Sequence, residues 1–332
     1  MKNINWGTYS KPIILVAFII VLAILKPAEF LSVSNFANVL WSISVIGIMV
    51  CGTIFVFLVG GIDLSIGSLC GLTAITIVTV INKMGFTTGS VFVGILAAIA
   101  VGALAGALHG IIITTFSIPA FLVTFATQII FSGISMVITN NKIVSCNEPA
   151  MFTAIGSMKI LGFPLPIYFM IVIAVISWFV LRKTVFGRQI YAIGGNPDAS
   201  AISGINVKRN TIFCYMLSGV TTAIGGIVLA SMTQQAMAST GSGYDTQVIM
   251  AGVIGGVSLL GGEGTVPGAI FGAVLMGLLN NGMNLMSVPS TQTGLVTGLV
   301  IIVAVGFDAL QHADQSRKKV KKIKSAVKKE AA

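Results

Sequence analysis

Apolar runs separated by short polar stretches divide most of the chain into segments of similar length. A helix needs about 20 mostly apolar residues to cross the hydrocarbon core of a bilayer. Glycine interrupts the third and the eighth segment, so we expect either one to be partly unwound or re-entrant. The pattern predicts an all-α membrane protein with about ten transmembrane helices, at residues 12–31, 38–59, 64–82, 90–114, 119–140, 163–182, 211–231, 246–262, 266–286 and 293–310.

Two features recur five segments apart and predict an internal repeat. Gly-Ile-Asp at residues 61–63 opens the third segment, and Gly-Tyr-Asp at residues 243–245 opens the eighth. Since five is odd, the second copy crosses the membrane in the opposite direction, as in the inverted-topology repeats of transporters. The alternative is that glycines mark only tight helix pairs. Glycines four residues apart also recur, at Gly102, Gly106 and Gly110 in the fourth segment and at Gly264, Gly268 and Gly272 in the ninth.

Asp63 and Asp245 stand at the openings of the third and eighth segments. A carboxylate at such a position can accept hydrogen bonds from the free amides of the helix that follows, so we expect both to cap helices. Contact with a substrate is the alternative. For His109, which lies between Gly106 and Gly110, we expect a packed, hydrogen-bonded side chain rather than a proton relay.

Charge distribution predicts the orientation of the chain. The formal net charge is +10, and 8% of residues are charged, against about 25% in soluble domains. Of the 19 Lys and Arg residues, 15 lie in the terminal segments or in loops after even-numbered helices, and four lie on the other side. The excess predicts that residues 1–11, the loop 183–210 and the tail 311–332 are cytoplasmic. The basic tail is expected to contact anionic membrane lipid, and nucleic acid is not an expected partner.

Residue patterns that would indicate an enzyme or a cofactor site are missing from the sequence. No Gly-Lys pair occurs, so there is no Walker A loop to bind ATP. The four cysteines form no C-x-x-C pair, and we expect neither a metal site nor a disulfide framework. The first apolar run, between Lys11 and Lys26, lacks a signal-peptide cleavage site and is interpreted as a retained helix.

The polar loop 183–210 contains the features of a short capped helix. Asn196 suits the N-cap, Pro197 suits the first helical position, and Asp198 places a carboxylate at the positive helix end. Gly204 is a typical stop. Two turns are marginally stable in water alone, so we expect this helix to lie against another surface; an ordinary capped loop helix is the alternative. Its apolar side would consist of Ala199, Ile202 and Ile205.

Uncharged polar residues inside the apolar segments are candidates for lining a transport pathway. They suit a neutral, hydroxyl-rich solute, because a fixed charge would hold or repel it without helping its release. Hydrogen bonding between helices is the alternative role. The candidates are Thr124, Thr127, Gln128 and Ser132 in the fifth segment, and Asn280, Asn281 and Asn284 in the ninth.

Four stretches together resemble one protein family: Gly60–Ser68, Phe186–Pro197 with Gly204–Val207, Gly255–Gly262, and Leu279–Leu285. The chain is similar to the membrane-spanning permeases of ATP-binding-cassette (ABC) sugar importers of the ribose, xylose and galactose type. In that family an acidic residue, two small residues and, four positions later, a glycine mark the coupling helix that docks on the ATPase subunit. Asp198 stands where glutamate is usual, and Glu263 stands where a basic residue is frequent. The resemblance thus assigns the coupling role to Gly194, Gly195, Asn196, Pro197, Asp198, Ala199, Ser200, Ile202 and Gly204.

The resemblance also implies partners and a substrate. ATP and Mg²⁺ would be bound by a separate ATPase subunit, and an extracytoplasmic binding protein would deliver a monosaccharide, most simply a ribose-type pentose. A second permease copy or a paralogue would complete the core in a bacterial cell membrane. The alternative is a secondary transporter driven by an ion gradient, which should carry acidic or histidine relays at the bilayer centre. Such residues are nearly missing here.

Overall fold

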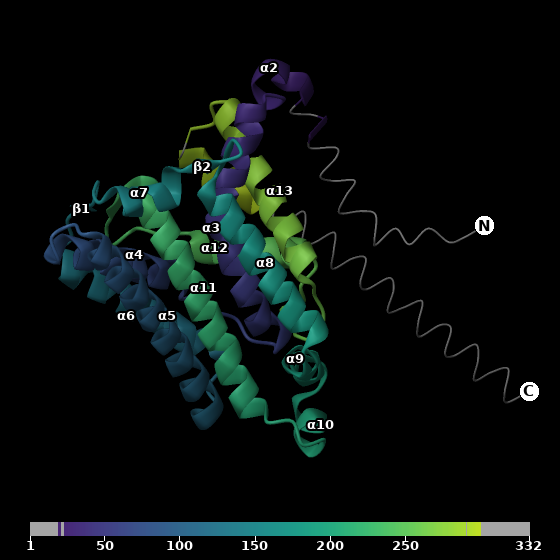
Figure 1. Ribbon diagram of the computed structural model, residues 1–332. Coiled ribbons are helices and arrows are strands. Elements are labelled where there is room, and N and C mark those ends of the chain that lie inside the picture. Colours follow the sequence, from purple (N-terminus) through teal and green to yellow (C-terminus); the bar gives the residue numbers. More distant parts are fainter. Residues whose placement is uncertain (1–18, 21–22, 290, 300–332) are drawn as a thin grey trace, which may run out of the picture. The chain divides into compact units, whose positions relative to one another are not determined.

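The computed structural model describes residues 19–20, 23–289 and 291–299 (Figure 1). The chain divides into two compact units, residues 1–30 with 279–332, and residues 31–278. The N-terminal residues 1–11, most of the first predicted helix, residues 300–310 of the tenth and the tail 311–332 lie outside the described residues. The candidate site lies wholly in the unit of residues 31–278.

Seven helices in the described residues are long and apolar enough to cross a membrane, and they match predicted segments two to seven and nine. They are α3 (Val33–Leu58), α4 (Ile66–Lys83), α5 (Thr88–Phe116), α6 (Ala120–Thr139), α8 (Leu165–Lys183), α11 (Val207–Thr233) and α13 (Val266–Leu285).

The eighth predicted segment, residues 246–262, is not one complete helix, which agrees with the expectation that its glycines interrupt it. In its place is α12 (Tyr244–Ile254), an 11-residue helix that is too short to span a bilayer. The chain then turns through glycines with positive φ, including Gly256 at 84° and Gly261 at 94°. Their left-handed backbone ends the helix and converts the remainder of the predicted segment into a loop.

Short elements lie between the long helices. They are α2 (Pro27–Phe30), α7 (Ala150–Ser157), α9 (Val185–Gly195), α10 (Pro197–Ile202), the antiparallel pair β1 (Val144–Ser145) and β4 (Gln235–Ala236), and the antiparallel pair β2 (Lys159–Ile160) and β3 (Phe163–Pro164). The hydropathy pattern did not indicate α7. It joins two long helices, because the Gly156 amide donates to Ser231 of α11 and the Trp41 indole of α3 donates to the Gly156 carbonyl.

The centre of this unit is the antiparallel pair α3 and α11. Met49 packs against Gly225, and Gly52 packs against Thr221, so the residue numbers run in opposite directions along the contact. α5 covers α11, and a Cβ atom added at Gly106 would overlap the carbonyl oxygen of Tyr215. Glycines therefore bring these backbones close together. Gly102 and Gly110 make equivalent contacts with Gly219 and Ile212 of α11.

The glycines of α13 make a second set of close contacts. A Cβ atom at Gly268 would overlap the carbonyl oxygen of Gly255, and one at Gly272 would overlap that of Ala251. The side of α13 that carries Gly277 packs against Ile43 of α3. Thus α13 lies antiparallel to both α12 and α3. Gly264, with φ at 149°, precedes α13 and packs against Val257.

α4 begins inside the unit, where Ser65 and Ile66 are buried, whereas α12 begins at a partly exposed position, with Gly243 exposed and Tyr244 half-buried. Residues 59–65 are not helical and lie along α11, where the Tyr215 hydroxyl donates to the Ile62 carbonyl over 3.4 Å. The Ser218 hydroxyl donates to Asp63 over 3.3 Å. Ser218 lies about 16 Å from the start of α11 at 1.5 Å per residue, so α4 begins nearly halfway along that helix.

The loop that precedes α12 meets the start of α4. Gly67 packs against the carbonyl of Gly241, and Gly71 packs against that of Thr240. Each of the two close approaches requires glycine, because a side chain would overlap the facing backbone. The first turns of α4 and α12 are therefore neighbours.

Candidate functional site

The loop between α8 and α11 contains the predicted short helix, α10. The Asn196 side chain accepts a hydrogen bond from the Ala199 amide over 2.9 Å, Pro197 is the first helical residue, and Asp198 lies in the first turn. The helix ends in a Schellman motif, in which the Gly204 and Ile205 amides donate to carbonyls of the last turn and Gly204 has a φ of 83°.

The surface of α10 is exposed. Ile202 is 90% exposed, although its side chain is large and apolar, and Pro197, Asp198 and Ala199 are also exposed. Ser200 is buried and faces the rest of the protein. An apolar side chain and a carboxylate on a capped helix that points away from the protein form a surface suited to a protein partner.

α9 attaches α10 to the helical core. The Phe186 ring stacks on Phe55 of α3 at 6.2 Å and meets Phe213 of α11 edge-on at 6.3 Å. Asn210 of α11 donates to the Gln189 side chain over 3.1 Å. α9 is thus fixed to both central helices, and movement of α10 would be transmitted to them.

The C-terminal end of α9 contacts three glycines from two other loops. We name these four residues the glycine junction: Gly60, Gly194, Gly261 and Gly262. A Cβ atom at Gly194 would overlap the Leu58 carbonyl and the Gly262 amide. The Gly262 amide donates to the Leu58 carbonyl over 2.9 Å. In contrast, nothing lies within 4 Å of a Cβ atom at Gly195. The junction connects the base of α10 to the loops that lead into α4 and α13.

Tyr191 adds a second connection. Its hydroxyl donates to the Gly264 carbonyl over 2.7 Å, just before α13 begins. Burial raises the pKa of this hydroxyl, and Arg182 opposes that shift. Tyr191 therefore stays protonated at neutral pH and can donate this hydrogen bond. Glu263 lies in the same loop, beside this connection.

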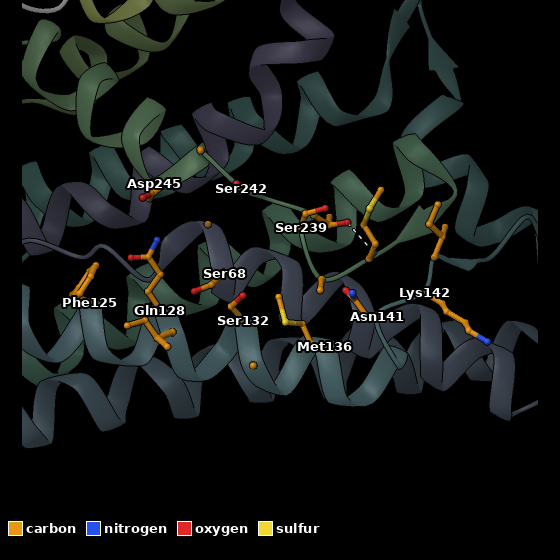
Figure 2. Close-up of a pocket in the computed structure, with 18 residues that line it drawn as sticks. Ser68, Phe125, Gln128, Ser132, Met136, Asn141, Lys142, Ser239, Ser242 and Asp245 are labelled. Carbon is orange, nitrogen blue, oxygen red and sulfur yellow. Dashed lines mark hydrogen bonds between the residues drawn. The ribbon is translucent and has the colours of Figure 1, made fainter. Parts of the chain in front are cut away.

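A cavity of about 640 Å³ lies between α6, the start of α4 and the loop before α12 (Figure 2). Gln128 and Ser132 point into it from α6, towards Ser68 of α4 and the segment that carries Ser242 and Asp245. Its wall combines hydroxyl and amide groups with apolar side chains such as Phe125 and Met136. Such a mixture is typical of a site for a small polar molecule.

The structure divides the four candidates on α6 into two pairs. Gln128 and Ser132 line the cavity, whereas Thr124 and Thr127 are buried in helix contacts. Thr124 donates to the Ala120 carbonyl over 2.9 Å, and the Thr127 hydroxyl lies 2.7 Å from Nε2 of His109. Thr127 therefore connects α6 to α5, whereas the 2.9 Å bond of Thr124 stays within α6 and a 3.4 Å bond joins Thr124 to the Ile62 carbonyl before α4.

His109 lies in a packed polar cluster. Its ring contacts Phe131 at 5.8 Å and Tyr215 at 6.2 Å between centroids, and its Nδ1 atom has no hydrogen-bond partner in the described structure. Asp63 is also buried and accepts hydrogen bonds from the Ser65 amide and hydroxyl over 2.9 and 2.6 Å. Asp63 nevertheless does not cap α4, because Ser65 is the N-cap residue, no side chain caps the helix, and the amide that Asp63 binds precedes the first helical residue; the expectation of capping is corrected.

Asp245 does not cap α12. The N-cap position is Gly243, no side chain caps the helix, and Asp245 lies in the first turn, with its carboxylate at the cavity. The expectation of capping is corrected, because the positive φ of Gly243, 82°, starts the helix two residues earlier.

The asparagine candidates Asn280, Asn281 and Asn284 lie in the last turns of α13, in the unit of residues 279–332, and take no part in this cavity. The sequence analysis missed Ser68, Ser239 and Ser242. Ser68 directly follows Gly67, and the other two stand in a Ser, Thr and Gly run before α12; those small polar residues were the available signal.

Groups of three or more His, Cys, Asp or Glu side chains that could hold a metal ion do not occur among the described residues. Cys51, Cys70, Cys146 and Cys214 are buried, and none of the four is in a disulfide.

Comparisons with known proteins agree with this architecture. The family model described as "Branched-chain amino acid transport system / permease component" matches residues 35–305. The ribose import permease protein RbsC of Haemophilus influenzae is 36% identical over 299 residues, which cover 89% of this chain and 91% of that protein. RbsC of Bacillus subtilis is also 36% identical, covering 89% and 90%. The L-arabinose transport system permease protein AraH of Escherichia coli is 34% identical, covering 91% and 90%.

No solved structure gives a significant match. The family model covers all seven long helices except the first two residues of α3, and the relatives match along nearly their whole length. Permeases of this kind are multi-pass membrane subunits without a cofactor of their own, because a separate ATPase subunit hydrolyses ATP. The chain therefore belongs to the branched-chain amino acid and sugar permease family of ABC transporters.

Proposed function

We propose that this protein is the permease subunit of an ATP-driven importer that moves a monosaccharide, most simply a ribose-type pentose, across a bacterial cell membrane. The observation that carries the proposal is the exposed, capped helix α10 with its base fixed at the glycine junction. The names of the relatives, which are ribose and arabinose permeases, support a pentose. Family membership argues against the ion-gradient-driven alternative.

In this function α10 is the coupling helix for the ATPase subunit. Asp198 and Ile202 would meet a groove of that subunit on the cytoplasmic side. When two ATPase subunits close on ATP, α10 moves with them and α9 follows as a rigid element. The glycine junction then passes the motion to the loops before α4 and α13, which opens or closes the pathway between them.

The helix contacts support an inverted repeat. With an offset of five segments, α3 corresponds to α11, α4 to α12 and α5 to α13. The antiparallel contact of α5 with α11 then corresponds to that of α13 with α3, as the glycine contacts require. We infer that the two halves cross the membrane in opposite directions, with both chain termini and α10 in the cytoplasm.

The partners follow from what this chain lacks. An extracytoplasmic binding protein would deliver the sugar, a separate subunit would hydrolyse ATP, and a second permease copy or a paralogue would complete the pathway. Gln128 and Ser132 would line that pathway in this subunit, while Asn280, Asn281 and Asn284 remain candidates for a part of it outside the cavity.

Uptake in membrane vesicles tests the proposal. Vesicles that contain the permease, its ATPase and its binding protein should accumulate labelled pentose only when ATP is supplied, and a protonophore should leave uptake unchanged. The substrate panel should include ribose, arabinose, xylose, galactose and leucine. Uptake of leucine without any sugar, or accumulation by the purified permease alone, would overturn the proposed function.

A further inference from the structure

The cavity beside α6 contains an acceptor group without a partner in the protein. The carboxylate of Asp245 is half-buried and accepts no hydrogen bond from any described residue. Among the described residues that line the cavity, Lys142 is the one positive side chain, and it lies at the opposite end (Figure 2). An ionised carboxylate can accept several hydrogen bonds, and those to charged acceptors are the stronger ones.

Donor groups lie on the facing wall of the same cavity. The first amides of a helix have no partner within the helix, and the side chain of Ser65 does not cap α4. Gly67 and Ser68 of that first turn line the cavity. The Asp245 carboxylate lies close to them, since a Cβ atom added at Gly67 would be 3.3 Å from Oδ1 of Asp245. In transporters, helices that begin inside the membrane direct their N-termini at the substrate.

These groups suit a molecule rich in hydroxyls. A sugar hydroxyl donates one hydrogen bond and accepts others, so it can bridge the Asp245 carboxylate and the first-turn amides of α4. The Ser68 hydroxyl donates to the Ser65 carbonyl over 2.9 Å, and its oxygen can accept a hydrogen bond from a second sugar hydroxyl. The Gln128 amide both donates and accepts, while Phe125 and Met237 offer apolar faces to the C–H groups of the ring. The cavity volume of about 640 Å³ lies within the range of small-molecule sites. The negative charge disfavours an anionic solute.

We propose that Asp245, Ser68 and Gln128 form a monosaccharide-binding site on the transport pathway, in which the Asp245 carboxylate accepts hydrogen bonds from two adjacent sugar hydroxyls. The proposal rests on the proposed function and adds substrate selection by the permease itself, after the binding protein has released the sugar. It assigns a substrate-contacting role to Asp245. Without that role, the carboxylate in the first turn of α12 would only interact favourably with the positive end of the helix dipole.

The test uses the complete importer in proteoliposomes, with the binding protein saturated by either ribose or 2-deoxyribose. The measured quantity is the uptake rate of ribose divided by that of 2-deoxyribose. Because the two sugars differ by the 2-hydroxyl group alone, this ratio reports how strongly the permease discriminates for that hydroxyl. Asp245→Asn should lower ribose uptake and reduce the ratio about tenfold, the effect of about 1.4 kcal/mol. Asp245→Glu keeps the charge at the helix start but displaces the oxygens, so it should reduce the ratio as well. Glu148→Gln, an exposed acidic residue outside the cavity, is the charge-matched control and should match the wild type.

A helix-dipole role predicts a different result, namely that Asp245→Glu restores the wild-type ratio, and that result would overturn the inference. An unchanged ratio in Asp245→Asn would overturn it too. If Asp245→Asn does not assemble, Ser68→Ala and Gln128→Ala carry the test, and wild-type ratios in both would contradict the site. These failures leave ribose uptake by the wild type intact, whereas failure of the proposed function removes it.

Discussion

At the scale of single residues, glycine determines how closely the helices approach one another. Lipid chains are as apolar as leucine, so helices in a bilayer associate through close packing rather than through the exclusion of water. Gly102, Gly106 and Gly110 place α5 against the backbone of α11, and Gly268 and Gly272 do the same for α13 and α12. A methyl group at any of these positions would meet a carbonyl or Cα atom instead of open space.

We predict that Gly106→Ala and Gly268→Ala lower the thermal stability of the purified protein in detergent, because each methyl group would overlap a facing carbonyl oxygen. Overpacking of this kind costs about 1–3 kcal/mol. The control is Gly89→Ala, also on α5, where the nearest atom to an added Cβ is Thr87 Oγ1 at 3.8 Å. The melting temperature of each purified variant is measured by light scattering during heating, a readout that does not depend on labelling of the buried cysteines. Variants as stable as the control would contradict the packing argument.

At the scale of elements, α10 has a sequence that favours a capped helix, and it exposes an apolar side chain and a carboxylate. Its two caps come from its own sequence, at Asn196 and Gly204, so the polar groups at both helix ends are satisfied locally. Its exposed side chains, Asp198 and Ile202, then remain free for another protein. A helix with both ends satisfied and an apolar side exposed is organised for docking.

We predict that Asp198→Lys and Ile202→Ser reduce co-purification of the ATPase subunit and abolish sugar uptake, while the permease keeps its detergent stability. The charge reversal removes an attraction, and the serine removes an apolar contact. Leu161→Ser is the matched control, because Leu161 is also 90% exposed but lies between β2 and β3, far along the chain from α10. Normal assembly and uptake in both α10 variants would rule out the docking role.

At the scale of the whole molecule, the glycine junction connects distant parts of the chain. It joins the end of α3, the base of α10 and the loop that leads into α13; Gly60 and Gly194 are 134 positions apart in the sequence, and Gly194 and Gly261 are 67 apart. Tyr191 reinforces this connection through its hydrogen bond to the Gly264 carbonyl. Domain closure at α10 can therefore act on both halves of the repeat at once.

We predict that Gly194→Ala reduces uptake strongly but leaves the ATPase bound, because the methyl group would displace Leu58 and Gly262 without touching the surface of α10. Gly195→Ala is a stringent control: it adds the same methyl group one residue later, where nothing lies within 4 Å. Alanine favours the helix at both positions by about 1 kcal/mol relative to glycine, so that effect is shared. Uptake and co-purification should be measured together. Equal uptake in the two variants would show that the junction does not transmit motion.

Hydropathy alone predicted seven of the long helices within a few residues, because a span is a property of about 20 consecutive side chains. The caps of α10 were also predictable, since Asn196, Pro197 and Gly204 act on their own backbone within one turn. Other features depended on residues far apart in the sequence. α12 is short because glycine turns and packing against α13 end the helix within the apolar segment 246–262. Hydropathy could not predict this, since a buried loop can be as apolar as a helix.

The candidate site shows the same division. Gln128 and Ser132 could be predicted from their spacing, which places them on one side of α6. Thr124 and Thr127 have similar spacing, yet they face His109 and the helix interior, because the rotation of α6 is set by its neighbours. Hydropathy and local hydrogen bonding thus determined the membrane class, the long helices and the capped helix α10. Only the folded chain brings Ser68 and Asp245 to one cavity, because the first turns of α4 and α12 meet there through glycine contacts between residues far apart in sequence.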